Sequence, residues 1–122
     1  MDDELRALLD ELSAYGAAHD SAEPDLSSTV DLQIADGGRY LAGLPDAAVD
    51  LLFLDAERVE YPRWWPHPAR VLRPGGVLAV DNVLSQADEV AEFLDLVAAD
   101  GRFVPTTVPV GKGLHLAWRR RP

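Results

Sequence analysis

Two short apolar runs of the sequence each end on side chains that can bind a metal ion. Asp55 directly follows the run LLFL (51–54), and the pair Asp81-Asn82 directly follows VLAV (77–80). If the two runs are neighbouring parallel strands, these side chains meet at one edge of a sheet, where open α/β folds bind their ligands. Two carboxylates and an amide oxygen suit Mg²⁺, which takes one or two carboxylates and completes its coordination with water and substrate. The alternative is that both acids only cap the helices that follow them.

The spacing of apolar residues predicts the elements that carry these side chains. Continuous apolar runs, typical of strands buried on both faces, cover 49–55 and 76–83. Apolar residues at helical spacing follow them over 61–72 and 87–99. We therefore expect an α/β fold whose sheet is parallel in its centre and ends in a C-terminal antiparallel hairpin. The other predicted elements are a strand at 29–36, a short helix at 39–44, and hairpin strands at 102–110 and 114–119 around a Gly-rich turn.

Composition and charge restrict the class of protein. The chain has 122 residues, no cysteine and a net charge of −10. The absence of cysteine excludes a disulfide framework, a thiolate zinc site and a cysteine nucleophile. An acidic chain repels phosphate backbones, so nucleic acid is not an expected partner. No apolar run approaches the roughly 18 residues of a membrane span, and the acidic start MDDELRALLDEL is unlike a signal peptide, so we expect a cytoplasmic protein without membrane contact.

The N-terminal residues are expected to be separate from the sheet. Leucines recur at helical spacing between positions 5 and 12, which predicts an amphipathic helix over 1–17. Small and polar residues interrupted by a proline predict a linker over 18–28. The α/β domain is then expected to occupy 29–122.

Several spaced motifs together give the chain a family resemblance. They are DLLFLDA (50–56), Tyr61, LRPGG (72–76), DNV (81–83) and VGKGL (110–114). In this order they closely resemble the second half of the metal-dependent, catechol-type O-methyltransferases, which are class I enzymes that use S-adenosylmethionine. The resemblance implies a truncated Rossmann-like methyltransferase sheet with strand order 3-4-5-7-6 in the family's numbering.

The same resemblance implies roles for particular residues. It implies that Asp55, Asp81 and Asn82 bind a divalent metal, which holds two vicinal hydroxyl oxygens of the acceptor and lowers the pKa of the one that is methylated. The position three residues after Asp55 is commonly a lysine that assists proton removal, and here it is Arg58. An arginine stays charged, so Arg58 can stabilise an oxyanion but cannot act as a base. Residues 84–88 correspond to the loop that shapes the acceptor pocket.

On the cofactor side the sequence departs from the family. It has no loop of the E-x-G-x-x-x-G kind, whose glycines let the backbone approach the cofactor. Asp36 is the one cofactor-side position that matches, because the family places an acid near the adenine there. The alternative is that Asp36 is a turn residue before Gly37-Gly38. We therefore expect binding of S-adenosylmethionine to be lost or severely weakened, while the edge for Mg²⁺ and the acceptor is retained.

Three functional hypotheses follow. The first is an O-methyltransferase-like protein for a hydroxyl of a small, catechol-type acceptor, impaired or inactive as a lone chain. The second is a pseudo-methyltransferase that acts as an interaction or oligomerisation partner, because exposed strand edges pair with other chains, including a second copy. The third is a non-catalytic sheet that arose by engineering or from a mis-assembled gene.

Overall fold

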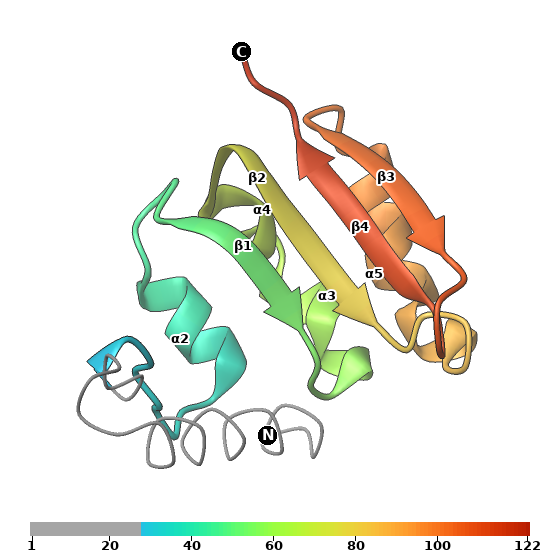
Figure 1. The fold of residues 1–122 in the computed structure, drawn as a ribbon, viewed down its shortest axis with the longest axis horizontal. Coiled ribbons are helices and arrows are strands. Elements are labelled where there is room, and N and C mark those ends of the chain that lie inside the picture. The colour runs from blue at the N-terminus through green and yellow to red at the C-terminus, as the bar shows by residue number, and fades with distance from the viewer. Residues whose placement is uncertain (1–27) are drawn as a thin grey trace, which may run out of the picture. The chain divides into compact units, whose positions relative to one another are not determined.

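The structure has the predicted α/β fold, in which strands and helices alternate along the chain. The computed structural model describes residues 28–122, and Asp36–Pro122 form one compact unit (Figure 1). The predicted helix over 1–17 and nearly all of the predicted linker over 18–28 lie outside the described residues. In chain order the elements are α2 (Gly37–Gly43), β1 (Val49–Leu54), the 3-10 helix η2 (Arg58–Glu60), α3 (Tyr61–Trp64), α4 (His67–Arg70), β2 (Leu72–Asp81), α5 (Ala87–Ala99), β3 (Phe103–Val108) and β4 (Leu114–Arg119).

The strands form a four-stranded sheet in the order β1-β2-β4-β3. Only β1 and β2 are parallel, whereas β4 is antiparallel to both of its neighbours. This order reproduces the 4-5-7-6 part of the predicted 3-4-5-7-6 sheet. The predicted parallel centre is therefore reduced to a single parallel pair among the described strands.

The predicted strand at 29–36 is wrong. Residues 29–35 contain no strand, and Asp36 is the N-cap of α2. Its alternating apolar side chains are solvent-exposed, with exposed fractions of 38% for Val30, 62% for Leu32 and 102% for Ile34. A strand is stabilised by its ladder and by cross-strand side-chain pairs. The apolar alternation was therefore not sufficient to produce a strand in this segment.

The helix predicted over 61–72 is also wrong as one element. It is divided into the single turns α3 and α4, separated at Trp65 and Pro66, and β2 already begins at Leu72. Proline disfavours helical backbone in the residue before it, and Trp65 is extended with ψ 136°. By contrast, α5 has the predicted bounds, and its apolar side chains Val90, Phe93 and Val97 are buried.

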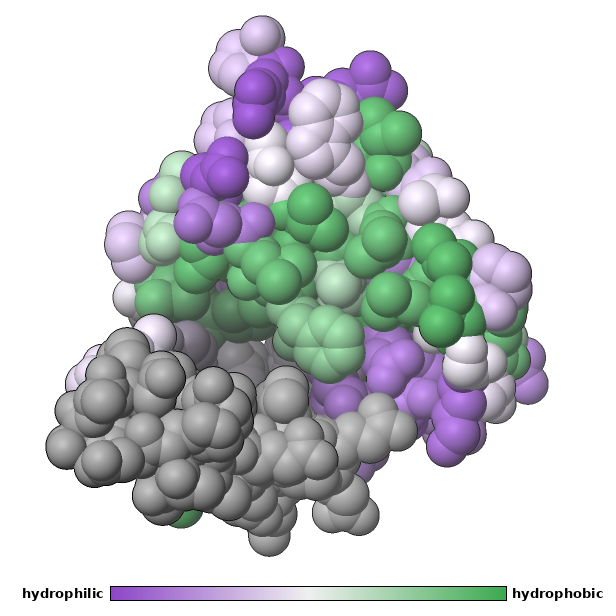
Figure 2. All heavy atoms as spheres, in the orientation of Figure 1, coloured by the Kyte–Doolittle hydropathy of each residue, from purple (hydrophilic) through white to green (hydrophobic). Residues whose placement is uncertain are grey.

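Alternate residues of the sheet face two different environments. Leu78, Val80 and Ala117 are fully buried on the face that carries α3, α4 and α5, which lie behind the strands in Figure 1. We call this the covered face. The other face points toward the viewer, and Figure 2 shows hydrophobic side chains gathered over it. We call this the open face. It carries the row Leu51, Val77, Trp118 and Val104, which the register places side by side across all four strands.

The guanidinium group of Arg70 joins α4 to the end of α2. It donates hydrogen bonds to the carbonyl oxygens of Leu41 (3.0 Å), Ala42 (3.0 Å) and Leu44 (2.6 Å). These carbonyls lie in and beside the last turn of α2, and the Leu41 carbonyl also accepts from the Leu44 backbone N–H at 3.1 Å. None of the helices within residues 28–122 is long and apolar enough to cross a membrane.

Candidate functional site

The two predicted metal-binding strands end side by side. β1 and β2 are parallel, and the register pairs Leu54 with Val80. Asp55 follows the end of β1 and Asp81 is the last residue of β2, so both acids lie at the same edge of the sheet. Asp55, Asp81 and Asn82 are all half-buried. The structure therefore brings the three residues to one edge, as the sequence predicted, and their binding of a metal stays a prediction.

The backbone turns sharply as it leaves β2. Asn82 has a positive φ of 61°, which is uncommon for a residue other than glycine but is most tolerated by Asn and Asp. The Asp81 carboxylate accepts a hydrogen bond of 2.9 Å from the Asn82 backbone N–H. One carboxylate oxygen of Asp81 thus stabilises the turn at Asn82.

The segment after β1 is held by a buried tyrosine. The hydroxyl of Tyr61 accepts a hydrogen bond of 2.7 Å from the backbone N–H of Ala56, the residue after Asp55. Burial is the main cause that raises the pKa of Tyr61 above its usual value, and the bond from Ala56 opposes that rise. The Tyr61 side chain is only 1% exposed, so its hydroxyl needs a partner such as this N–H.

Arg58 lies in η2 and reaches across to α5. Its guanidinium group forms an ion pair of 3.5 Å with Glu89, in the first turn of that helix. The Arg58 side chain is 22% exposed. Its positive charge also lowers the pKa of Tyr61, so it acts near the segment that carries Asp55.

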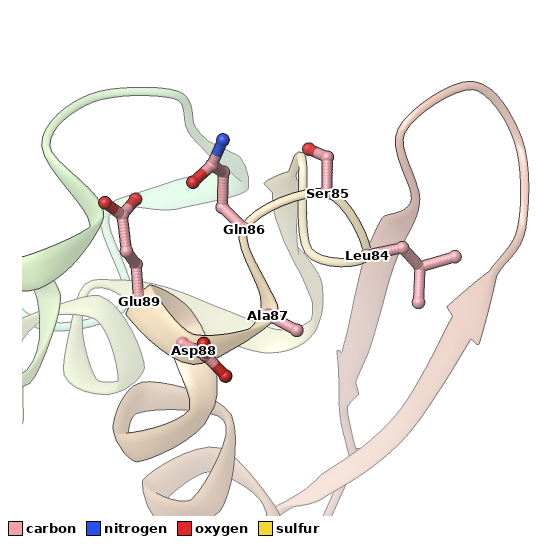
Figure 3. A pocket seen from close by; sticks show the side chains of 6 residues that line it. All are labelled: Leu84, Ser85, Gln86, Ala87, Asp88 and Glu89. Carbon is pink, nitrogen blue, oxygen red and sulfur yellow. The ribbon is translucent and has the colours of Figure 1, made fainter.

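A pocket lies beside the end of β2. It is lined by six consecutive residues, Leu84 to Glu89, and the side chains of Gln86 and Glu89 project to the same side in Figure 3. This lining contains the 84–88 loop that the resemblance assigned to the acceptor. It begins two residues after Asn82 and includes Glu89, the ion-pair partner of Arg58.

The turn of the β3–β4 hairpin fixes the loop that forms this pocket. The backbone N–H groups of Leu84 and Ser85 both donate to the Lys112 carbonyl, at 3.0 and 3.2 Å, and that of Val83 donates to Gly113 at 3.2 Å. Gly113 has a φ of +93°, and a Cβ there would lie 2.8 Å from the Leu84 backbone nitrogen. The close approach of hairpin and loop therefore requires glycine at this position.

The comparison with known proteins identifies the family. A family model described as O-methyltransferase matches residues 24–120. The chain belongs to the O-methyltransferase family. A Mycobacterium avium protein named as an O-methyltransferase is 37% identical over an alignment of 98 residues, and the match covers 68% of this chain and 44% of that protein.

Solved structures of O-methyltransferases show the same fold. One from Klebsiella pneumoniae has a TM-score of 0.67 at 26% identity and covers 77% of this chain and 51% of that chain. One from Bacillus cereus, solved in complex with SAH, has a TM-score of 0.57 at 22% identity and covers 68% of this chain and 46% of that chain. This O-methyltransferase family chain thus spans about half the length of the relatives that it matches.

The donor set of the candidate site fits a hard cation by its chemistry. No group of three or more His, Cys, Asp and Glu side chains within residues 28–122 is arranged to hold a metal ion. Two carboxylates and one amide oxygen are nevertheless enough for Mg²⁺ when water and substrate complete the coordination. In this O-methyltransferase family chain, Asp55, Asp81 and Asn82 are the residues that would hold such a cation.

The predicted cofactor residue has a structural role. The Asp36 carboxylate accepts a hydrogen bond of 3.0 Å from the Arg39 backbone N–H and caps α2. The glycines that follow it let the indole of Trp64 approach, because a Cβ at Gly38 would lie 2.6 Å from its Nε1. The contact of Asp36 with adenine stays a prediction.

Sequence reasoning missed two residues of this edge. Glu89 lies in the helix predicted over 87–99, to which the sequence assigned no role in metal binding, yet it pairs with Arg58. Tyr61 was noted as part of a motif, without a function for its hydroxyl. A tyrosine in a predicted buried face was the available signal, because a buried hydroxyl needs a hydrogen-bond partner.

Proposed function

We propose that the chain carries the metal and acceptor half of an O-methyltransferase site for a hydroxyl of a small, catechol-type acceptor. The observation that supports this proposal is the meeting of Asp55 and Asp81 at the ends of parallel strands, beside the pocket formed by Leu84 to Glu89. Membership of the O-methyltransferase family makes methyl transfer to oxygen the chemistry to test.

In this proposal Asp55, Asp81 and Asn82 hold Mg²⁺. When bound, the cation would lower the pKa of an acceptor hydroxyl and bind the resulting oxyanion. The chain's own residues then provide orientation and charge. Arg58 adds a fixed positive charge, which can stabilise an oxyanion but cannot remove its proton. The ion pair with Glu89 restrains Arg58 next to the pocket, since Glu89 is also one of the lining residues.

Methyl transfer by this chain alone is proposed to be weak or absent. S-Adenosylmethionine is the methyl donor that the resemblance implies, and the related B. cereus structure contains SAH. This sequence lacks the glycine-rich cofactor loop and spans 44% of the M. avium relative. We therefore propose that Mg²⁺ binding is retained and that binding of S-adenosylmethionine is severely weakened. The cytoplasmic location stays a prediction.

Thermal unfolding with and without Mg²⁺ tests the metal site. We expect Mg²⁺ to raise the melting temperature of the full chain, because a ligand that binds only the native state stabilises it. Asp81→Ala should abolish that increase. Asp95→Ala removes the same group from an exposed position on α5 and should retain it. An unchanged increase in Asp81→Ala would show that Asp81 is not a ligand.

Calorimetric titration tests the cofactor part of the proposal. S-Adenosylmethionine is titrated into the full chain with and without Mg²⁺. We expect dissociation constants weaker than about 1 mM, a binding free energy of about −4 kcal/mol. Micromolar binding would show that the chain has a cofactor site despite the missing loop. Absence of both Mg²⁺ and cofactor binding would exclude the enzymatic proposal for this chain alone.

The edge strand β1 supports a second candidate function. In it, the chain is a non-enzymatic protein that pairs with a second copy of itself. Leu51 and Phe53 of β1 are 62% and 45% exposed, and among the described strands β1 has β2 as its single neighbour. An unpaired edge can pair with the same edge of another copy about a two-fold axis.

Sedimentation velocity tests this candidate at micromolar concentration. A dimer is expected for the full chain, and Leu51→Asp should dissociate it. Val110→Asp places the same charge at a residue that is 65% exposed in the hairpin turn, and should leave the dimer intact. A monomeric wild-type chain would exclude the second candidate.

A further inference from the structure

Tyr61 has a buried ring and a hydroxyl group that is hydrogen-bonded. The ring is 1% exposed and packs against Trp64 and Phe93, with ring centroids 5.1 and 5.4 Å away. Phe93 is itself fully buried on α5. The position of the hydroxyl is therefore fixed by contacts with α3 and α5, and not by the loop that it bonds.

The Tyr61 hydroxyl is hydrogen-bonded to the segment that follows β1. Ala56 comes directly after Asp55, and its backbone N–H donates to the Tyr61 hydroxyl over 2.7 Å. Residues 55–57 lie between the end of β1 and the start of η2, and Glu57 is the N-cap of η2. The Tyr61 bond connects this short segment to the aromatic cluster of Tyr61, Trp64 and Phe93.

Burial is the main cause that raises the pKa of Tyr61, and nearby charges have smaller effects. Arg58 lowers the pKa of Tyr61, whereas the carboxylates of Asp55 and Glu57 raise it. Burial has the largest effect and also raises the pKa, so the phenol is neutral near pH 7. A neutral hydroxyl that accepts from Ala56 still has its own proton to donate.

We propose that Tyr61 is a positioning residue, whose buried hydroxyl fixes the Asp55–Ala56 backbone and so holds the Asp55 carboxylate in place for a divalent cation. This inference rests on the proposed function, because it needs Asp55 to be a ligand. A carboxylate on a restrained backbone loses less conformational freedom on binding than one on a mobile loop. Tyr61 itself is not assigned any contact with cation or acceptor.

Tyr61→Phe in the full chain tests the inference, because it removes the hydroxyl and leaves the ring. Exchange of the Ala56 amide proton, measured by NMR, should become faster, since its hydrogen-bond acceptor is lost. Mg²⁺ affinity, measured by calorimetry, should fall by about three- to tenfold, the equivalent of one hydrogen bond. Phe93→Leu is the matched control, because it disturbs the same cluster without removing the hydrogen bond. It should lower the melting temperature and leave Mg²⁺ affinity within about twofold of wild type.

The outcomes separate this inference from the proposed function. Unchanged Ala56 exchange in Tyr61→Phe would overturn the inference at its first step. Faster exchange with unchanged Mg²⁺ affinity would show that Tyr61 fixes the loop but does not position a ligand. Equal losses of affinity in Tyr61→Phe and Phe93→Leu would show a merely structural role. If the wild-type chain binds no Mg²⁺, the proposed metal site fails and the positioning role fails with it, whereas the exchange data still report the loop contact.

Discussion

The two faces of the sheet carry similar side chains in opposite environments. On the covered face, Leu78 and Val80 are fully buried beneath helices. On the open face, Leu51 is 62% exposed and Trp118 is 42% exposed. Both faces are apolar, and this is why the strand sequences read as continuous apolar runs instead of alternating patterns.

The sequence of a strand determines which of its faces are apolar, whereas the other elements of the chain determine which face is covered. A strand that is apolar on both faces belongs to a sheet with two covered faces. The described helices α3, α4 and α5 lie on one of them (Figure 1). The open face therefore exposes side chains, among them Leu51 and Trp118, of the type that the covered face buries.

The largest expected effect comes from truncating one leucine on each face. Leu78→Ala should lower the free energy of unfolding by about 2–5 kcal/mol, because it removes a fully buried side chain and leaves a cavity. Leu51→Ala should lower it by less than about 1 kcal/mol, since its side chain is already 62% exposed. Urea unfolding of both variants at one low protein concentration measures the two values. A cost for Leu51→Ala equal to that for Leu78→Ala would show that the open face is buried in solution.

A second test asks whether an exposed side chain implies a loosely packed backbone. Leu84 is 55% exposed, yet its backbone nitrogen would lie 2.8 Å from a Cβ at Gly113. Gly113→Ala should cost about 1–3 kcal/mol of stability, because of the clash and the φ of +93°. It should also weaken any Mg²⁺ response, since the displaced loop follows Asn82 directly. Gly101→Ala is the control, because a Cβ there meets no atom within 4 Å. Equal stabilities of the two variants would contradict the close packing.

The parts of the fold that were predicted correctly depend on local patterns. The bounds of α5 followed from apolar residues at helical spacing. The hairpin followed from a Gly-rich turn between two strand-like runs. A helix was predicted to end at Leu72 and the next strand to begin at residue 76, whereas β2 already begins at Leu72. Its pairing with β1 is irregular between Val49 and Leu51, and such a tertiary detail has no local sequence signal.

The candidate site was predictable in its residues but not in its contacts. Strand ends and residue types were sufficient to place Asp55, Asp81 and Asn82 at one edge. The ion pair between Arg58 and Glu89 joins positions 31 residues apart in the sequence, and it depends on how η2 and α5 pack. The bond between Tyr61 and Ala56 likewise depends on the burial of the tyrosine ring.

A third test concerns the polar residue of the covered face. His115 is 6% exposed, its Nδ1 lies 2.9 Å from the Thr107 hydroxyl, and its Nε2 has no hydrogen-bond partner. Burial lowers the pKa of His115 below its usual value, so the unfolded chain binds more protons as the pH falls below about 6.5. Stability should therefore decrease from pH 7 to pH 5. His115→Leu should reduce this decrease. Identical pH profiles for His115→Leu and wild type would exclude His115 as the cause.

The smallest expected effect concerns the ion pair between Asp100 and Arg102, at the connection between α5 and β3. The Arg102 guanidinium donates to both carboxylate oxygens of Asp100, at 2.6 and 3.0 Å, and these bonds hold the pKa of Asp100 below its usual value. The unfolded state then binds more protons at acid pH, so this contribution is present above about pH 4 and is lost as the pH falls further. Asp100→Asn should cost about 0.2–1 kcal/mol at pH 7, because the Arg102 side chain is 47% exposed to solvent. It should also flatten the stability profile below pH 4, as measured by urea unfolding at pH 7 and pH 3. Asp95→Asn, at an exposed position on the same helix, is the control and should leave both values unchanged. A loss above 2 kcal/mol in Asp100→Asn would mean that this connection stabilises the covered face as strongly as its buried side chains do.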